Sequence, residues 1–572
     1  MATDTTRLEN VFSTSAVFSI PNYQRDYAWE KKNLEDLWED LLEANANASD
    51  SMGHFLGTIV VAPNKENPQI LDLIDGQQRS TTIFMLRIAL YSKAKAFDYD
   101  KNKFIDRNGD LLLQVVKDNR EFFAKIIESL KNLKLDSTLE NEASTQGQKR
   151  LYEVAKSILD KLSSIDEAQA ESYRQSLDKM VLMKLQENNS GKAIRMFQSV
   201  NDRGVPLSLL DKLKSLLILY SNKFCGGELD EEINKRFGEI FAVVLKIQEH
   251  KVVSSIADRD FAKYAEDRIF NYHAYGCENI GHYKYGADTA YDMLKNYLKN
   301  KDKSTLKEWL DSYSSDLLAF YKGFYAVMQM SESSVEAFKF FMVLKANPYF
   351  YNALIRSYIN GFLDDEVFRL FNQAEVLMYG FYSTNDAAAC RLFEITSSKE
   401  TFKNELKQRS LKLRKDDYDS FDEAFGDDIY RDNYGWGKYF HYMFLSYHAK
   451  DMEINDFWEL VKNKTFNNQI EHIIPQNAPD NGLLEKFGFK DESEYEGLKN
   501  TFGNLLSLEG GLNSAAQDKD LIGKRGEYKK SSVSYNRIFA QRENFLDFNK
   551  ESIKAENEKF KLWAREYFKE FI

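Results

Sequence analysis

The sequence predicts a predominantly helical α+β protein that is built from more than one domain. Its 572 residues are several times the length of a typical domain. Only 7 prolines and 27 glycines interrupt the chain, which favours long helices over a sheet with many turns. Strand-like patterns occur near the two ends. We therefore expect an α/β domain at residues 1–220, a helical middle at 221–440 and a smaller α+β domain at 441–572.

The N-terminal domain begins with strand and helix signals in alternation. An extended, proline-containing segment, FSIPNYQRDYAWEKK, occupies residues 18–32. The next segment, NLEDLWEDLLEA (residues 33–44), has apolar residues at helical spacing. HFLGTIVVA (54–62) and QILDLID (69–75) have the composition of strands and are separated by a turn-rich stretch.

Two helix starts are marked in this domain. A tight turn, DGQQR, follows the second strand, and the hydroxyl residues 80–82 could cap the helix that comes after it. Farther on, Asn-Asp-Arg-Gly at residues 201–204 predicts a turn. Ser208 and Asp211 have the spacing of a capping box for the helix that follows.

The middle of the chain is expected to be mainly helical, because a single proline, Pro348, lies between Pro206 and Pro475. No repeat period is visible there. At the C-terminal end, QIEHIIP and NLLSLEG predict short strands. Residues 513–530 look helical with a glycine interruption, and residues 543–572 predict an amphipathic helix or a pair of helices.

The composition excludes several classes of protein. A net charge of -12 argues against a protein that binds nucleic acid through overall positive charge. Cys225, Cys277 and Cys390 lie far apart, so they predict neither a disulfide framework nor a cysteine zinc site. The start of the chain lacks an apolar signal-peptide core, and no stretch has the length of a membrane span. We therefore expect a cytoplasmic protein with no membrane partner.

Near the C-terminus, residues typical of phosphodiester chemistry occur in a defined order. Glu471 and His472 begin the run Glu-His-Ile-Ile-Pro, Asn504 follows in Gly-Asn-Leu, and Asn513 lies nine positions later. A histidine titrates near neutrality and can take a proton from water. Carboxylate and amide oxygens suit Mg²⁺, which stabilises charge on the phosphate. The alternative for a lone histidine on an apolar strand is a core residue with satisfied hydrogen bonds.

This order resembles the HNH nucleases (the His-Me finger or ββα-metal fold), in the subgroup whose motif reads His-Asn-Asn. The resemblance implies that His472 is the general base and that Asn504 holds its backbone or imidazole in place. It also implies that Asn513, with Glu471 as the second ligand, binds Mg²⁺ or Mn²⁺. One departure is that the residue before the base is often Asp in this fold, whereas Glu471 is longer by one methylene.

A basic segment follows the motif directly. Seven basic and two acidic residues lie between residues 519 and 542, which gives this segment a local net charge of +5. Such a segment could neutralise DNA phosphates beside the cutting site, although a solvated helix face would have the same composition. The residues expected to contact DNA are Lys519, Lys524, Arg525, Lys529 and Lys530.

The DGQQR turn of the N-terminal domain could bind phosphate. Its glycine permits a sharp turn, exposed amides at a helix start attract phosphate, and its arginine could clamp it. No P-loop pattern occurs in the chain. The turn resembles the D-G-x-x-R signature of ParB-like domains. Together with IPNYQRDYAW upstream, it resembles the N-terminal domain of GmrSD-type (type IV) restriction endonucleases, whose C-terminal half is an HNH domain.

The resemblance implies a ParB-like domain whose turn binds or hydrolyses a nucleotide, GTP or ATP. For the aromatic residues Tyr23, Tyr27 and Trp29 the alternative is core packing, which we favour for Trp29. For Arg25 and Arg79 the alternative is a buried ion pair with Asp26 or Asp75. The implied nucleotide-binding residues are Asp75, Gly76, Gln77, Gln78, Arg79, Tyr23, Gln24 and Arg25.

The leading hypothesis is an endonuclease of bacterial antiviral defence that cleaves modified phage DNA and is gated by NTP binding or hydrolysis. A homodimer would suit a duplex cutter with one active site per chain. The alternatives are a non-catalytic, nucleotide-dependent DNA-binding regulator and an RNA-directed toxin nuclease. The residues do not indicate which DNA modification or which nucleotide is recognised.

Overall fold

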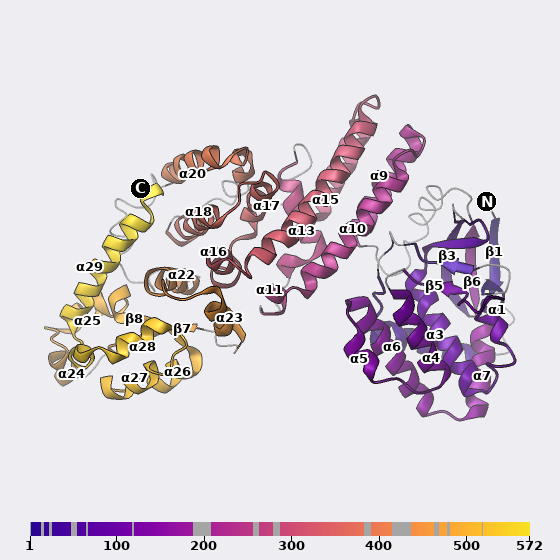
Figure 1. Ribbon diagram of the computed structural model, residues 1–572, viewed down its shortest axis with the longest axis horizontal. Coiled ribbons are helices and arrows are strands. Elements are labelled where there is room, and N and C mark those ends of the chain that lie inside the picture. Colours follow the sequence, from indigo (N-terminus) through magenta and orange to yellow (C-terminus); the bar gives the residue numbers. More distant parts are fainter. Residues whose placement is uncertain are drawn as a thin grey trace. The chain divides into compact units, whose positions relative to one another are not determined.

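The chain divides into two compact units. The first comprises residues 1–249 with 291–318, and the second comprises 250–290 with 319–572. Figure 1 labels many of their elements. The computed structural model describes residues 2–12, 17–21, 24, 26–46, 54–64, 67–116, 119–186, 208–255, 262–277, 287–381, 391–413, 436–462, 468–476, 481–517 and 519–571.

The first unit contains a curled mixed sheet, and its described strands follow the spatial order β1-β6-β3-β4-β2-β5. Strand β6 pairs antiparallel with β1 and parallel with β3, while β3 and β4 are antiparallel. The strands are β1 (Ala2–Arg7), β2 (Val17–Ser19), β3 (Phe55–Pro63), β4 (Ile70–Asp75), β5 (Leu113–Gln114) and β6 (Val181–Gln186). The predicted strands at 54–62 and 69–75 are confirmed as β3 and β4.

The helices α3, α4, α6 and α7 gather on one side of this sheet (Figure 1). Their apolar faces and the strands form one continuous core. The helices of this unit are α1 (Leu8–Val11), α2 (Lys31–Ala46), α3 (Gln77–Lys93), η1 (Lys101–Lys103), α4 (Arg120–Lys131), α5 (Thr138–Glu142), α6 (Gln146–Ser163), α7 (Glu167–Lys179), α9 (Leu209–Cys225) and α10 (Asp230–Glu249). The predicted helix at 33–44 is confirmed as α2.

Helix α3 begins at a glycine instead of a hydroxyl cap. Gly76 is the N-cap with φ +82°, and a Cβ there would lie 2.7 Å from Cγ2 of Ile59. The predicted cap among residues 80–82 is therefore wrong. Thr81 and Thr82 lie in the second turn of the helix, where their hydroxyls donate to the carbonyls of Gln77 and Gln78. By contrast, the Ser208 cap of α9 is confirmed, because its hydroxyl accepts from the backbone N–H of Asp211 at 3.2 Å.

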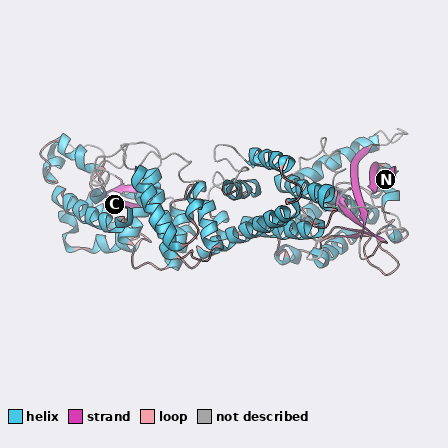
Figure 2. Ribbon diagram, turned by 90° about the horizontal axis from the view of Figure 1, so that it is seen from above, coloured by secondary structure: helices cyan, strands magenta, loops and turns pink. Residues whose placement is uncertain are grey.

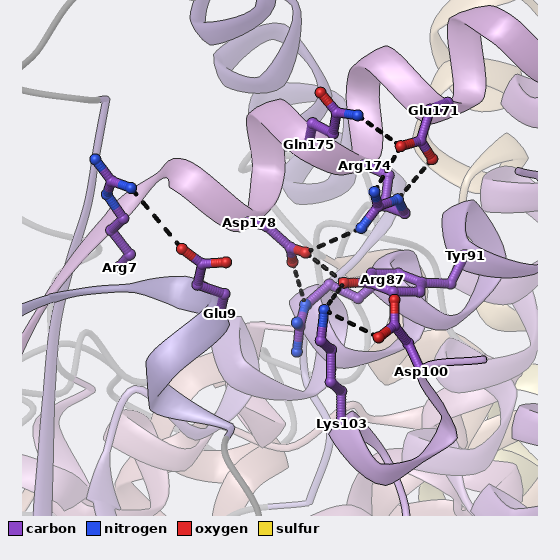
Figure 3. A network of polar contacts seen from close by, with 10 residues as sticks. All are labelled: Arg7, Glu9, Arg87, Tyr91, Asp100, Lys103, Glu171, Arg174, Gln175 and Asp178. Atoms are coloured by element: carbon purple, nitrogen blue, oxygen red, sulfur yellow. Dashed lines mark hydrogen bonds and ion pairs between the residues drawn. The ribbon is translucent and has the colours of Figure 1, made fainter. Parts of the chain in front are cut away.

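A buried polar network joins α3 to α7 (Figure 3). The side chain of Arg87 is fully buried, and its Nε donates to Oδ1 of Asp178 at 2.9 Å. The hydroxyl of Tyr91 donates to the other oxygen of Asp178, and Lys103 donates to that hydroxyl at 3.0 Å. Arg174 lies over the Tyr91 ring at 4.6 Å. Every charge in this network faces an opposite charge or an aromatic ring, and the network ties α3 to α7 within the core.

The second unit is almost entirely helical, and strands β7 (Asn468–His472) and β8 (Leu505–Glu509) are its described sheet (Figure 2). The helix α14 (Ala287–Asn300) and the long helix α15 (Leu306–Met330) run across the division of the chain. The other helices up to residue 462 are α11 (Lys251–Ser254), η4 (Ala262–Tyr264), α13 (Glu266–Tyr275), α16 (Val335–Phe338), η5 (Lys339–Val343), η6 (Pro348–Phe350), α17 (Tyr351–Ile359), α18 (Asp365–Glu375), η7 (Val376–Phe381), η8 (Arg391–Ile395), α20 (Lys399–Leu413), α22 (Trp436–His448) and α23 (Ile454–Lys462).

The C-terminal part packs helices on the two-stranded antiparallel sheet, in which His472 is opposite Leu505. Helix α22 packs behind β8, where Nδ1 of His441 is 2.9 Å from the Ser507 hydroxyl. Both predicted strands are confirmed, but the break in the predicted helix is not at its glycines: α26 ends at Ala516, α27 begins at Leu521, and Gly523 and Gly526 lie inside α27. The helices are α24 (Asn481–Lys486), α25 (Glu492–Lys499), η9 (Phe502–Asn504), α26 (Gly510–Ala516), α27 (Leu521–Tyr528), α28 (Ser534–Gln541), η10 (Glu543–Asp547), α29 (Lys550–Tyr567) and η11 (Lys569–Phe571).

Candidate functional site

The two N-terminal motifs meet through amide side chains that bind the backbone. Oε1 of Gln78 accepts from the N–H of Ala28 at 2.7 Å, and its Nε2 donates to the carbonyl of Asp26 at 3.0 Å. Nε2 of Gln24 donates to the carbonyl of Ile74, at the end of β4. Gln78 therefore holds the extended segment against the start of α3 through one donor and one acceptor of its amide.

Asp26 anchors the same segment at the N-terminus of α6. Its carboxylate accepts from the Tyr27 N–H at 2.7 Å, from the Asn119 amide and from the Thr145 hydroxyl. A side chain at Gly147 would overlap this carboxylate, so the contact requires glycine there. Burial raises the pKa of Asp26, and these hydrogen bonds oppose the rise. Asp26 is thus a structural anion at a helix N-terminus.

The electrostatics of the turn centre on Asp75 and Arg79. Burial raises the pKa of Asp75 to about 6; the Gly76 N–H and the charge of Arg79 oppose this rise, and Asp211 of α9 adds to it. Burial also lowers the pKa of Arg79, whereas the negative charge of Asp75 raises it. Among the residues that the structure describes, Oε1 of Gln77 is buried and has no hydrogen-bond partner. The turn therefore offers a guanidinium, an unsatisfied amide and the first amides of a 17-residue helix.

Several residues of the N-terminal prediction lie outside the described residues: Tyr23, Arg25 and the turn at 201–204. Of the aromatic residues for which core packing was the alternative, Tyr27 is buried with its hydroxyl 2.6 Å from that of Thr82. Trp29 is partly buried and packs against the core. Both rings thus lie where the packing alternative expects them.

In the C-terminal motif, His472 ends strand β7 and is only 6% exposed. Its Nε2 lies 2.9 Å from Oδ1 of Asn500, which is equally buried. Its backbone carbonyl accepts from Nζ of Lys524 at 2.6 Å. The ring and the backbone of His472 are therefore each held by a neighbouring side chain.

Asn504 is fully buried and clamps the chain just after His472. Its Oδ1 accepts from the N–H of Ile474 at 2.9 Å, and its Nδ2 donates to the carbonyls of Ile474 and Lys499. The Asn504 carbonyl accepts from the N–H of Ile473 as well. Asn504 thus fixes the backbone beyond His472, and its described hydrogen bonds do not include the imidazole.

Glu471 lies in a buried ion pair. Its Oε1 accepts from Nζ of Lys524 at 2.6 Å and from the Tyr528 hydroxyl at 2.7 Å. The Lys524 side chain is 1% exposed. Burial raises the pKa of Glu471, while Lys524, Tyr528 and the His472 N–H lower it. Because an ammonium already neutralises this carboxylate, Glu471 does not fit the role of a metal ligand in this arrangement.

Asn513 lies on α26 beside strand β7. Its Nδ2 donates to Oε1 of Gln469 at 2.7 Å, and its Oδ1 makes no hydrogen bond within the described residues. An amide oxygen of this kind suits Mg²⁺. The described part of the chain holds no group of three or more His, Cys, Asp and Glu side chains arranged for a metal ion. Asn513 therefore fits the proposed cation, whereas the predicted pair of Asn513 and Glu471 does not.

The basic segment is less open than its composition suggests. Lys519 and Lys530 both form ion pairs with Glu527 at the surface, at 2.9 Å and 2.8 Å. Lys529 is exposed. Nε of Arg525 donates to the carbonyl of Ala540 at 2.7 Å, which ties α27 to α28. Lys524 is buried with Glu471, so the surface cations among the five predicted contacts are Lys519, Lys529 and Lys530.

Three residues that organise the site were missed by the sequence reasoning: Asn500, Tyr528 and Asn557. Asn557 of α29 accepts from the N–H of Gly503 at 2.6 Å and donates to the Thr501 hydroxyl at 2.8 Å. No spacing rule connects these three residues to the motif. The one feature that could have pointed to them is Asn500 itself, an asparagine four positions before Asn504.

Comparison with known proteins gives two matches. The family model described as the GmrSD restriction endonuclease N-terminal domain matches residues 8–218. The model described as the GmrSD restriction endonuclease C-terminal domain matches residues 415–562. No curated protein matches the chain, and no helix in the described ranges is both long and apolar enough to cross a membrane. Because the two domain models cover more than half of the chain in the predicted order, the chain belongs to the GmrSD restriction endonuclease family.

Proposed function

We propose that this restriction endonuclease cleaves modified phage DNA by hydrolysing a phosphodiester bond, with His472 as the general base. The observation that carries the proposal is the placement of His472 at the end of β7. Its imidazole is bound by Asn500 and its backbone by Lys524. A base that is fixed in this way can activate water without reorganising during the reaction.

The neighbouring residues support distinct parts of the reaction. Asn504 holds the chain beyond the base, and Lys519, Lys529 and Lys530 neutralise phosphates of the bound duplex. A bound Mg²⁺ or Mn²⁺ would stabilise negative charge on the scissile phosphate. Asn513 is the residue that would hold this cation through Oδ1, and Glu471 remains the partner of Lys524.

We further propose that the DGQQR turn binds an NTP, GTP or ATP, whose binding or hydrolysis gates cutting. The first amides of α3, Gln77 and Arg79 would receive the phosphates, and Asp75 lies beside them. Gln78 and Asp26 act indirectly, because they hold the preceding segment in place. A homodimer would supply one active site for each DNA strand.

The test is a cleavage assay on phage DNA with and without base modifications, in the presence of Mg²⁺ or Mn²⁺. The His472→Ala variant should lose cleavage, whereas Lys529→Met should cut with weaker, more salt-sensitive DNA binding. Equal cutting by His472→Ala and the wild type would exclude His472 as the base. Equal cutting of plain and modified DNA would exclude dependence on modification.

The gate is tested by NTP hydrolysis and by its effect on cutting. Arg79→Ala should lose hydrolysis, or lose the effect of NTP on cleavage, while its thermal midpoint shows that the unit is folded. If both GTP and ATP turnover and their effect on cutting are unchanged in Arg79→Ala, the nucleotide does not bind at this turn.

A further inference from the structure

A buried asparagine that lies outside the predicted motif contacts the proposed base. Asn500 follows α25 directly and is 6% exposed, as is His472. Its side-chain oxygen Oδ1 faces Nε2 of His472 at 2.9 Å. An amide oxygen can only accept a hydrogen bond, so this contact requires the proton of the neutral imidazole to be on Nε2. Nδ1 then carries the lone pair.

The turn that carries Asn500 is held from both sides. Nδ2 of Asn504 donates to the carbonyl of Lys499 at 2.8 Å, one residue before Asn500. Asn557 binds Thr501 and Gly503, the residues that follow. A Cβ at Gly503 would collide with the Ile553 carbonyl, so α29 lies directly against this turn. The backbone on both sides of Asn500 is therefore held by two other amides.

We propose that Asn500 is a positioning residue, which fixes the tautomer and the ring orientation of His472. This inference rests on the proposed function of His472. In the reaction, the O–H bond of water breaks and its proton moves to Nδ1. The water oxygen forms a bond to phosphorus as the bond from phosphorus to the leaving oxygen breaks, and the leaving oxygen takes a proton from solvent. Throughout, the Nε2–H stays hydrogen-bonded to Asn500.

Three substitutions separate positioning from simple packing. Asn500→Asp keeps an acceptor oxygen at the same place and removes the amide donor, whereas Asn500→Leu removes both. Asn536→Leu is the matched control, because Asn536 is buried in the same unit and donates to Ser507 and Ser531 instead of the base. A thermal midpoint for each variant reports the loss of packing alone.

The first readout is the single-turnover rate of DNA cleavage at saturating DNA. Asn500→Leu should cut about 10- to 100-fold more slowly, the loss typical when a partner that orients a histidine is removed, with KM unchanged. Asn500→Asp should recover most of the rate. Asn536→Leu should lose stability but keep its rate at a temperature where it is folded. If Asn500→Asp is as slow as Asn500→Leu, or if Asn500→Leu is as fast as the wild type, the proposal is wrong.

The second readout does not depend on cleavage. Nitrogen-15 shifts of the imidazole, assigned by comparison with His472→Ala, should report the Nε2–H tautomer in the wild type and in Asn500→Asp. Asn500→Leu should show a mixture of tautomers. If His472→Ala loses activity but the Nε2–H tautomer persists in Asn500→Leu, His472 is still the base and the proposed role of Asn500 is wrong. Full activity of His472→Ala would overturn the proposed function, and the shifts would still decide whether Asn500 fixes the ring.

Discussion

The substitution Lys524→Met distinguishes a buried structural cation from a DNA contact. Nζ of Lys524 lies 2.6 Å from Oε1 of Glu471 and 2.6 Å from the carbonyl of His472. Methionine fills a similar volume and removes the charge together with both hydrogen bonds. It therefore leaves the Glu471 carboxylate buried without its neutralising partner.

The expected cost follows from the burial of the pair. Removing one partner of a buried ion pair destabilises a protein by about 3–5 kcal/mol, because the remaining charge is uncompensated. In a unit of this size each kcal/mol lowers the melting temperature by about 2–4 °C, so we expect a decrease on the order of 10 °C. Lys530→Met is the control. The Lys530 side chain is 62% exposed, and Glu527 keeps its ion pair with Lys519 in this variant, so the loss should be about 0–1 kcal/mol.

The assay is thermal and urea denaturation of the full chain at several pH values. Burial already raises the pKa of Glu471, and the loss of Lys524 raises it further. Glu471 then takes up a proton as the pH falls, so the destabilisation of Lys524→Met should shrink in acid. The double variant Glu471→Gln with Lys524→Met should recover most of the stability, because glutamine is neutral and still accepts from Tyr528.

A melting temperature of Lys524→Met equal to that of Lys530→Met would refute this reasoning. If Lys524→Met also reduced the salt dependence of DNA binding by about one ion, Lys524 would be the phosphate contact that the sequence predicts. Glu471 would then be free to bind a cation, and the predicted metal site formed by Asn513 and Glu471 would again be supported.

Three further predictions concern the N-terminal unit. Gly147→Ala should lower its melting temperature, because the new methyl group would overlap the carboxylate of Asp26; an unchanged midpoint would contradict the contact. Burial raises the pKa of Asp75 from 3.8 to about 6, so the folded state keeps a proton that the unfolded state releases. Stability should therefore fall as the pH rises from about 4 to about 6, by up to about 3 kcal/mol, and urea titrations of Asp75→Asn should lack this slope. Arg87→Met should destabilise the unit by about 3 kcal/mol or more in urea denaturation, because Asp178 remains buried without its cation; a loss below about 1 kcal/mol would contradict this.

Much of the fold could be predicted from local patterns, and long-range pairing could not. The apolar spacing of residues 33–44 and the strand compositions of 54–62 and 69–75 identified α2, β3 and β4. Strand β1 was missed because its sequence, Ala-Thr-Asp-Thr-Thr-Arg, is polar. Among the described strands it lies at the edge of the sheet and pairs with β6 alone, so it has little need for apolar residues. The cap of α3 was assigned to hydroxyls, although the left-handed Gly76 begins the helix.

For the candidate site, the sequence located the strand that carries His472 but not the partners of its side chains. Glu471 and His472 are adjacent in sequence, yet consecutive strand residues point to opposite faces. Glu471 therefore meets Lys524 of α27, whereas His472 meets Asn500 after α25. The partner of each is set by how α27 and the turn before β8 pack on the sheet. The composition places Lys524 in a basic segment, but in the structure its side chain is buried against Glu471.

The amide residues of both motifs share one physical task. Gln78 binds the backbone of the segment before α2, and Asn504 binds the backbone just after His472, each through its donor and its acceptor. Because both ends of each amide bind backbone groups, these two residues act by holding neighbouring segments in place. The groups to which we assign chemistry in the proposed function are His472 and Asn513 in the C-terminal part, and Gln77 with Arg79 at the start of α3. Substitutions of Gln78 or Asn504 should therefore change stability and activity together. His472→Ala should abolish activity and also lower stability, because the ring is buried and Asn500 loses its partner.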